Sequence, residues 1–159
     1  MHTANDFLAV WKLESDSTLR VFNALSDEKL AQSVVPGGYT LQSLAWHITT
    51  SINAIPAHAG LMPMPPRPST AASVAGIVEA YKQNSARLVA AVEEKATDAF
   101  LAEQVDFFGH NMRRGALLSI TLFHQTHHRA QMTVLMKQAG LKIPGVYGPS
   151  EDDLKAAKK

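Results

Sequence analysis

Two histidines in the last third of the chain, His124 and His128, have the spacing of ligands in a helical metal site. Side chains four residues apart lie on one face of a helix, so both imidazoles can reach the same ion. The chain has no cysteine, which leaves nitrogen and oxygen atoms as its only metal ligands. Two imidazoles leave a divalent ion under-coordinated, and His47 is the best candidate for a third ligand from another helix. We therefore predict one divalent metal site formed by His47, His124 and His128.

The residues around the histidine pair support this prediction. The stripe expected to face the core mixes apolar and polar side chains: Leu117, Thr121, His124, His128, Gln131 and Leu135. Each buried polar group without a partner costs about 1 to 3 kcal/mol, and a bound metal would supply a partner for the imidazoles. Gln131 could hydrogen-bond a ligating imidazole. Arg129 could pair with a carboxylate on a neighbouring helix, although helix packing is the favoured interpretation. His127 is rotated by roughly 100° from His128 and points elsewhere.

Each histidine also has a simpler explanation. A single histidine on an apolar face, such as His47, is usually a core residue bonded to a backbone carbonyl. Histidine pairs four residues apart also arise by accident on helix surfaces. We expect His58 and His110 to be solvated, because they lie at or near predicted loops or helix ends, and His2 has no informative context.

Hydrophobic periodicity predicts four long helices that would carry these residues. Three of them are expected at about residues 5–25, 41–59 and 116–138, and another has its apolar stripe between Val74 and Val92. The expected N-terminal caps are Asn5 or Asp6, then Thr40, then Ser69 and Thr70. Gly140 is placed to end the last helix.

The connecting segments have their own signals. Residues 61–68 hold four of the eight prolines, so this stretch cannot be helical and is expected to be an extended crossover. Residues 100–115 fit an irregular excursion or a weak hairpin better than a helix. From residue 142 onward we expect an apolar tail packed across the bundle, followed by a charged, frayed end.

The composition excludes several classes of protein. A chain of 159 residues with 46% hydrophobic residues is expected to form one domain, spanning residues 1–159. The net charge is +1 and the basic residues are mostly scattered, so nucleic-acid binding is not expected. Neither a targeting segment nor a run of 18 apolar residues is found, so we expect a cytoplasmic protein without membrane contacts.

The first helix carries apolar residues on more than one face. These residues are Phe7, Trp11, Phe22 and Leu25. A patch of this kind would suit a symmetric partner, so we predict a homodimer.

Two motifs resemble those of one family. The segment Phe123-His124-Gln125-Thr126-His127-His128-Arg129-Ala130-Gln131, followed by Leu135, Gly140 and Pro144, resembles the hallmark of the DinB/YfiT-like superfamily. That hallmark is a histidine, three residues, then His-Arg-Gly-Gln, and Ala130 replaces its usual glycine. The segment Leu44-Ala45-Trp46-His47-Ile48 is similar to the family's first metal-binding histidine on the second helix. The resemblance covers essentially the whole chain.

This resemblance implies an all-α, antiparallel four-helix bundle with a long crossover connection. It also implies a zinc or nickel site at His47, His124 and His128, and commonly a homodimer. Members with known chemistry include transferases and isomerases that use low-molecular-weight thiols. Other members are known only as DNA-damage-inducible proteins.

Three neutral imidazoles would leave the ion an open coordination position, as in a catalytic site. A thiol bound there could be activated as thiolate and attack a small electrophilic substrate. We therefore predict a metal-dependent, low-molecular-weight-thiol S-transferase, or a related hydrolase or isomerase. The alternatives are a non-catalytic stress-response protein that the metal stabilises, and a dimerisation bundle whose histidines acquire metal adventitiously.

Overall fold

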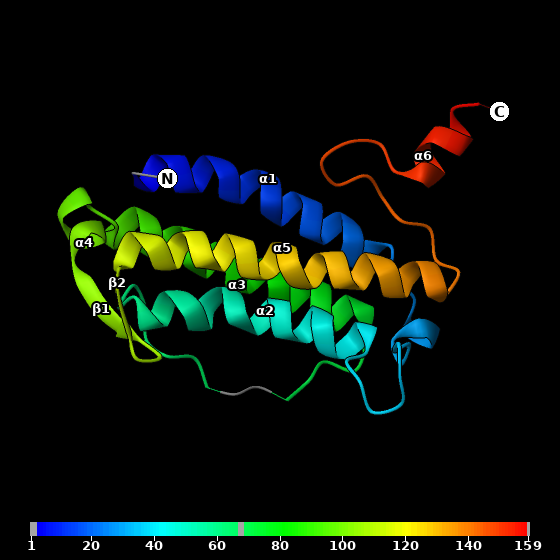
Figure 1. Cartoon of the computed structure of the whole chain (residues 1–159), viewed down its shortest axis with the longest axis horizontal. Coiled ribbons are helices and arrows are strands. Elements are labelled where there is room, and N and C mark those ends of the chain that lie inside the picture. Colours follow the sequence, from blue (N-terminus) through cyan, green and yellow to red (C-terminus); the bar gives the residue numbers. More distant parts are fainter. Residues whose placement is uncertain (1–2, 67–68, 159) are drawn as a thin grey trace.

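The computed structural model describes residues 3–66 and 69–158, so His2 and Pro68 lie outside the described residues. The chain is mostly helical, and four long helices form a bundle (Figure 1). These helices are α1 (Ala4–Asn23), α2 (Leu41–His58), α3 (Val74–Lys95) and α5 (Arg114–Gln138). The predicted fold class, an all-α four-helix bundle with a long crossover, is confirmed.

Shorter elements connect and extend the bundle. They are the 3-10 helix η1 (Asp27–Lys29), helix α4 (Asp98–Ala102), strands β1 (Gln104–Phe107) and β2 (His110–Arg113), and helix α6 (Glu151–Ala156). The two strands pair as an antiparallel hairpin. Of the two alternatives predicted for residues 100–115, an irregular excursion or a weak hairpin, the hairpin is therefore confirmed. Residues 151–156 form α6 instead of the frayed end that we expected, because Ser150 and Asp153 cap the helix reciprocally.

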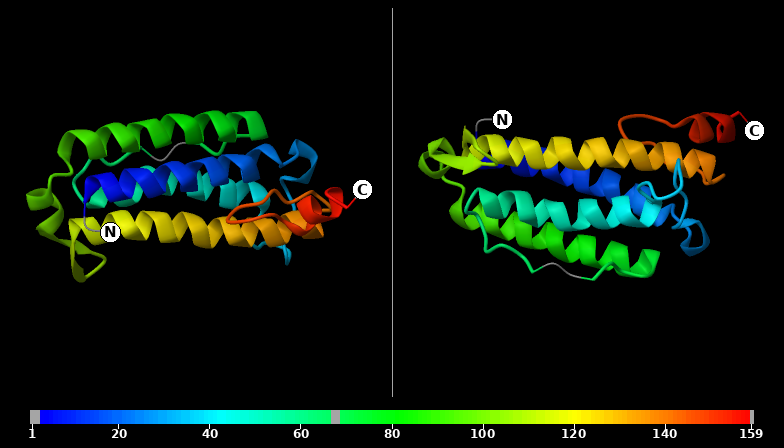
Figure 2. Two further views of the ribbon diagram at one scale, coloured as in Figure 1. Left: turned by 90° about the horizontal axis from the view of Figure 1, so that it is seen from above. Right: turned by 60° about the horizontal axis from the view of Figure 1, so that its bottom comes forward.

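The long connection between α2 and α3 determines the direction of the helices. It returns the chain to the end of the bundle at which α2 begins, so α2 and α3 run in the same direction (Figures 1 and 2). Helix α2 packs against α5 and α3, and α1 packs against α3 and α5. The pairs α2–α5 and α1–α3 are antiparallel, and the contact between α2 and α5 is the most extensive. The middle of α2 therefore lies opposite the middle of α5.

Two of the predicted helix caps are wrong. Thr3 caps α1, and the predicted cap Asp6 is instead its partner three residues later in a capping box. Ser73, not Ser69 or Thr70, caps α3. The carboxylate of Asp27 also accepts a hydrogen bond from the backbone N–H of Val74, which ties the start of α3 to η1. Thr40 caps α2 as predicted.

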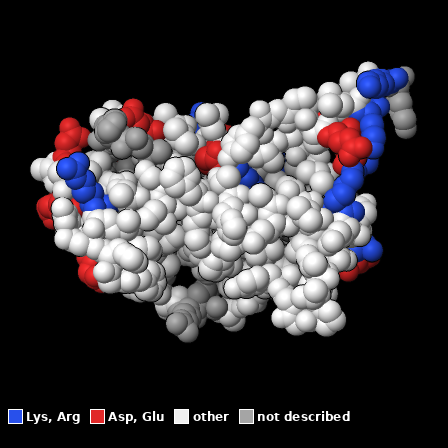
Figure 3. All heavy atoms as spheres, viewed as in Figure 1, with Lys and Arg blue, Asp and Glu red and all other residues white. Residues whose placement is uncertain are grey.

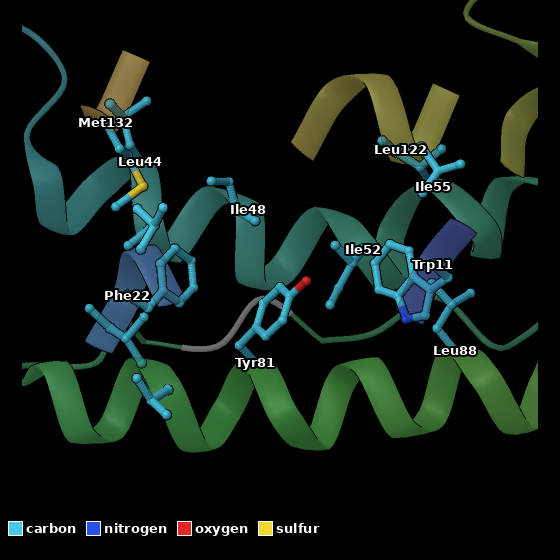
Figure 4. Packing of buried hydrophobic residues seen from close by; sticks show 14 of the residues in the cluster. Trp11, Phe22, Leu44, Ile48, Ile52, Ile55, Tyr81, Leu88, Leu122 and Met132 are labelled. Atoms are coloured by element: carbon cyan, nitrogen blue, oxygen red, sulfur yellow. The ribbon is translucent and has the colours of Figure 1, made fainter. Parts of the chain in front are cut away.

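The apolar residues of all four long helices meet in one core (Figure 4). The residues that we assigned to a dimer surface are buried inside the protomer: Phe7, Trp11 and Phe22 on α1, and Leu25 just after it. That assignment was wrong because α1 packs against two helices, which together cover its wide apolar face. The homodimer stays a prediction without this support. No helix in the described part of the chain is long and apolar enough to cross a membrane.

A buried ion pair joins α5 to α1. The Arg129 side chain is 2% exposed, and its Nη2 lies 2.8 Å from Oε2 of Glu14. The same guanidinium donates hydrogen bonds to the backbone carbonyl of Glu14, to Oγ1 of Thr18 and to the hydroxyl of Tyr147 in the C-terminal tail. Arg129 therefore pairs with a carboxylate on a neighbouring helix. From the sequence we had favoured helix packing over this ion pair.

Replacing one partner of this pair should destabilise the protein strongly. Arg129→Met leaves the Glu14 carboxylate buried and unpaired, so we expect the free energy of unfolding to fall by about 3 to 5 kcal/mol in urea titrations. The double variant Glu14→Leu/Arg129→Met should recover much of this loss. Lys155→Ala, which removes an exposed ion pair with Glu151, should change the free energy of unfolding little, because solvent screens that pair. If Arg129→Met and Lys155→Ala lowered the free energy of unfolding equally, burial of the Glu14–Arg129 pair would not explain its contribution to stability.

Candidate metal centre

Helices α2 and α5 bring the three predicted ligands together. Nε2 of His47 lies 3.1 Å from Nε2 of His124. One ring nitrogen from each of His47, His124 and His128 can be chosen so that all three atoms lie within 4.8 Å of one another. Each imidazole is half-buried at the solvent-facing edge of the contact between the two helices. His47 and His124, 77 positions apart in sequence, meet because the two helices are antiparallel.

The local pattern of each helix explains this placement. On α2, His47 lies between Leu44 and Ile48, which both point into the core. On α5, Thr121 and Gln125 are buried on either side of His124. The imidazoles therefore lie where the buried face of each helix meets its exposed face. Core packing fixes the backbone, while the ring nitrogens remain within reach of a small ligand.

The arrangement is compatible with a divalent metal ion. Zinc binds imidazole nitrogen at about 2.0 to 2.1 Å, which places two ligands of a tetrahedral ion about 3.3 Å apart. The His47–His124 separation matches this value, and small side-chain rotations would bring His128 into range. Among the described residues, no carboxylate or further histidine completes the cluster. The site would therefore offer three nitrogen ligands and leave a coordination position open.

Gln131 orients one of the imidazoles. Its Oε1 atom lies 2.8 Å from Nδ1 of His128 and accepts a hydrogen bond from it. A proton held on Nδ1 leaves the lone pair of Nε2 free to bind a metal. The prediction that Gln131 hydrogen-bonds a candidate ligand is thus confirmed, although Gln131 is exposed and does not face the core as we expected.

The environment keeps two of these imidazoles neutral. Burial, assisted by the neighbouring His128, lowers the pKa of His47 below its ordinary value. Burial is also the main cause that lowers the pKa of His124, to about 4, with further contributions from His128, His47 and His127. Neutral imidazole is the form that binds metal, so both side chains are ready to act as ligands at neutral pH.

The other described histidines are exposed and do not belong to the group of three. His127 is exposed and is not one of the three grouped residues, although the edge of its ring contacts that of His128, with ring centroids 4.9 Å apart. His110 is exposed on β2, in agreement with the expectation of solvation. His58 is also exposed, but its ring lies 5.4 and 5.5 Å from those of Phe107 and Phe108 at the hairpin.

Sequence reasoning missed the partners that hold α5 from behind the site. Glu14 and Tyr147 both contact Arg129, the residue that follows His128. A signal for Glu14 was present, because it occupies a position on the apolar stripe of α1, where a charged residue needs a buried partner. No comparable signal marks Tyr147, which lies in an irregular tail.

Comparison with known proteins agrees with the motifs. The family model described as the DinB family matches residues 1–159. The chain belongs to the DinB family. This DinB family chain is similar to a protein of Bacillus subtilis (strain 168) named uncharacterized protein YrdA. The two are 39% identical over 153 residues, and the alignment covers 95% of this chain and 92% of that relative.

Solved structures of DinB-like proteins share the fold. A crystal structure from Bacillus cereus ATCC 10987 matches with a TM-score of 0.86 at 39% identity, over 92% of this chain and 99% of the other. Bacillus subtilis YjoA matches with a TM-score of 0.73 at 18% identity, over 89% and 96% of the two chains. The latter similarity concerns the fold alone. The family resemblance predicted from the two histidine motifs is confirmed.

Substitution of single histidines should separate ligands from bystanders. We expect His47→Ala, His124→Ala and His128→Ala each to weaken zinc binding by at least about 100-fold, since loss of a group that only orients a ligand already costs about 10- to 100-fold. His127→Ala, beside the cluster, is the matched control and should bind zinc normally. Competition titrations with a chromophoric chelator measure these affinities. Equal weakening in all four variants would contradict the assignment.

The lowered pKa of His124 predicts the pH dependence of the metal-free protein. Between pH 6.5 and about 4, unfolded His124 is protonated while the folded form is neutral. The unfolded state binds more protons in this window, so stability should fall as the pH falls through it. Urea titrations from pH 7 to pH 4 should therefore show a smaller loss of stability for His124→Gln than for the wild type. Identical pH profiles would contradict the lowered pKa.

Proposed function

We propose that this protein is a metal-dependent S-transferase that uses a low-molecular-weight thiol and a small electrophilic substrate. The observation that carries the proposal is a cluster of three imidazoles which, among the described residues, has no fourth protein ligand. Closed structural sites have four protein ligands, whereas catalytic sites keep a position for water or substrate. Zinc or nickel is the proposed ion, since imidazole suits both.

The described residues hold the site in a suitable state. His47 and His124 are kept neutral by burial, and Gln131 holds the proton of His128 on Nδ1. A divalent ion bound there would lower the pKa of a coordinated thiol and favour its thiolate form. The thiol proton would pass to solvent, which reaches the half-buried cluster directly. The sulfur would then form a bond to an electrophilic carbon as the leaving group departs with its electron pair.

The apolar core argues against a purely structural role for the metal. Leu44 and Ile48 of α2 and Leu117 and Met132 of α5 are buried in the same core, away from the histidines. The two helices therefore have extensive contacts that do not depend on an ion. We expect the metal-free protein to remain folded.

Titration of the cobalt-substituted protein with 2-mercaptoethanol tests the proposed function. A thiol entering the open position should produce a sulfur-to-cobalt charge-transfer band and release one proton. Its apparent affinity should rise about tenfold per pH unit below the pKa of the free thiol. Ethylene glycol is the control, since it has a hydroxyl in place of the thiol. Absence of the band, together with cooperative unfolding on chelation, would instead support the non-catalytic stress-response protein.

A further inference from the structure

An apolar groove of about 410 Å³ lies beside the histidine cluster. Its walls come from the loop between η1 and α2, from α2 and from α5. The lining residues are Val34, Val35, Gly38, Tyr39, Leu44, Gln131, Val134 and Leu135. Backbone pairing of Ser33 with Thr40 closes the loop, and a hydrogen bond from the N–H of Gly38 to the carbonyl of Val35 tightens it.

The groove and the histidines share neighbouring residues. Leu44 lies three residues before His47 on α2, and Gln131 lies three residues after His128 on α5. Each is therefore about one helical turn from a candidate metal ligand. Gln131 also accepts the hydrogen bond from Nδ1 of His128, so one side chain lines the groove and orients the site. A molecule lying in the groove could thus present one end to the imidazoles.

The groove exposes apolar side chains that are normally hidden. Val34, Val35, Tyr39 and Val134 are all more than half exposed, although they lie together. Such a concentration of exposed apolar groups marks a binding site more often than an ordinary surface. Its volume falls within the range of about 300 to 1,000 Å³ typical of small-molecule sites.

The lining of the groove and the helix faces between it and the histidines carry almost no charge. Helix α2 contains no Asp, Glu, Lys or Arg, and between residues 115 and 136 of α5 the only such residue is Arg129, which is buried. Figure 3 shows a broad uncharged area over the two helices, with charged groups gathered mainly toward the ends of the molecule. None of the residues that line the groove carries a formal charge. An anionic ligand would find no cationic side chain in the lining, and Lys137, two residues beyond Leu135, is paired with Glu151 and Asp152.

We propose that this groove is the specificity site, and that it binds the apolar, uncharged part of the small-molecule substrate. The reactive end of that substrate would lie at His47, His124 and His128. The assignment of the bound molecule as a substrate rests on the proposed function. The binding of an uncharged apolar molecule in the groove does not, because it needs neither metal nor thiol.

Two dyes of matched shape test the binding step in the protein, before and after chelation. N-phenyl-1-naphthylamine is uncharged, and 8-anilinonaphthalene-1-sulfonate adds a sulfonate to the same ring system. We expect the uncharged dye to bind with increased fluorescence, and the sulfonate to bind at least tenfold more weakly. Equal or tighter binding of the sulfonate would overturn the proposed selectivity.

Two variants locate the dye. Val134→Glu places a charge in the groove and should weaken binding of the uncharged dye at least tenfold. Leu13→Glu is the control, because Leu13 is a similarly exposed apolar residue on α1, 68% exposed against 57% for Val134. It should leave binding unchanged, and circular dichroism should show that both variants are folded. Equal binding to both variants would place the dye elsewhere and overturn the proposal.

A second copy of the chain is the competing occupant, and light scattering distinguishes it. If the wild type is a dimer that Val134→Glu converts to a monomer, and the wild type binds no dye, the groove is a subunit interface and the proposal fails. The experiment also separates this inference from the proposed function. Dye binding without a cobalt–thiol band would support the groove as a binding site and contradict the transferase function. A cobalt–thiol band without dye binding would support the transferase function and contradict the proposed role of the groove.

Discussion

The antiparallel packing of α2 against α5 positions every group in the candidate site. One side of this contact is filled by buried apolar residues, such as Leu44, Ile48 and Leu117. The other side is open to solvent, and the three imidazoles lie along it. Because these apolar contacts do not involve the imidazoles, a ligand could bind on the polar side without disturbing them. A site at such an edge combines a rigid backbone with access for small molecules.

Helix α5 supports the site from its opposite face. Arg129 follows His128 and is therefore rotated by about 100° around the helix, which directs it toward α1. There it binds Glu14 and Thr18 and reaches Tyr147. A buried ion pair of this geometry tolerates little displacement, since each charge would lose its partner. The pair consequently restricts rotation and sliding of α5, and so holds His124 and His128 against α2.

Local signals in the sequence were sufficient for much of this structure. The four-residue spacing of His124 and His128 depends only on helix geometry, and the proline-rich segment excludes a helix between α2 and α3. His47 was identified because it lies in mid-helix on a mixed polar and apolar stripe. The two wrong helix caps, by contrast, were chosen among neighbouring Ser, Thr, Asn and Asp residues that can all cap a helix. Tertiary contacts decide where the helix begins, as the hydrogen bond from the Val74 N–H to Asp27 does for α3.

Non-local features were harder to predict. The wide apolar face of α1 fits either a dimer surface or a helix covered on both sides by its own chain, and only the packing of α3 and α5 decides between them. The Glu14–Arg129 pair links positions 115 residues apart, and periodicity alone does not match such partners. The groove likewise depends on how residues 34–39 fold back over α5, which no periodic pattern describes.

The scarcity of charge on α2 and α5 has a chemical consequence for the candidate metal centre. An ion held by three neutral imidazoles keeps its full double charge, because none of its ligands is anionic. Exposed carboxylates nearby would offset this charge, and exposed lysines would attract competing anions. The described faces of α2 and α5 around the histidines carry neither. Electrostatic attraction at this edge would then come mainly from the ion itself. An anionic sulfur would be drawn to the open coordination position, while the apolar walls of the groove would select the molecule that lies beside that sulfur.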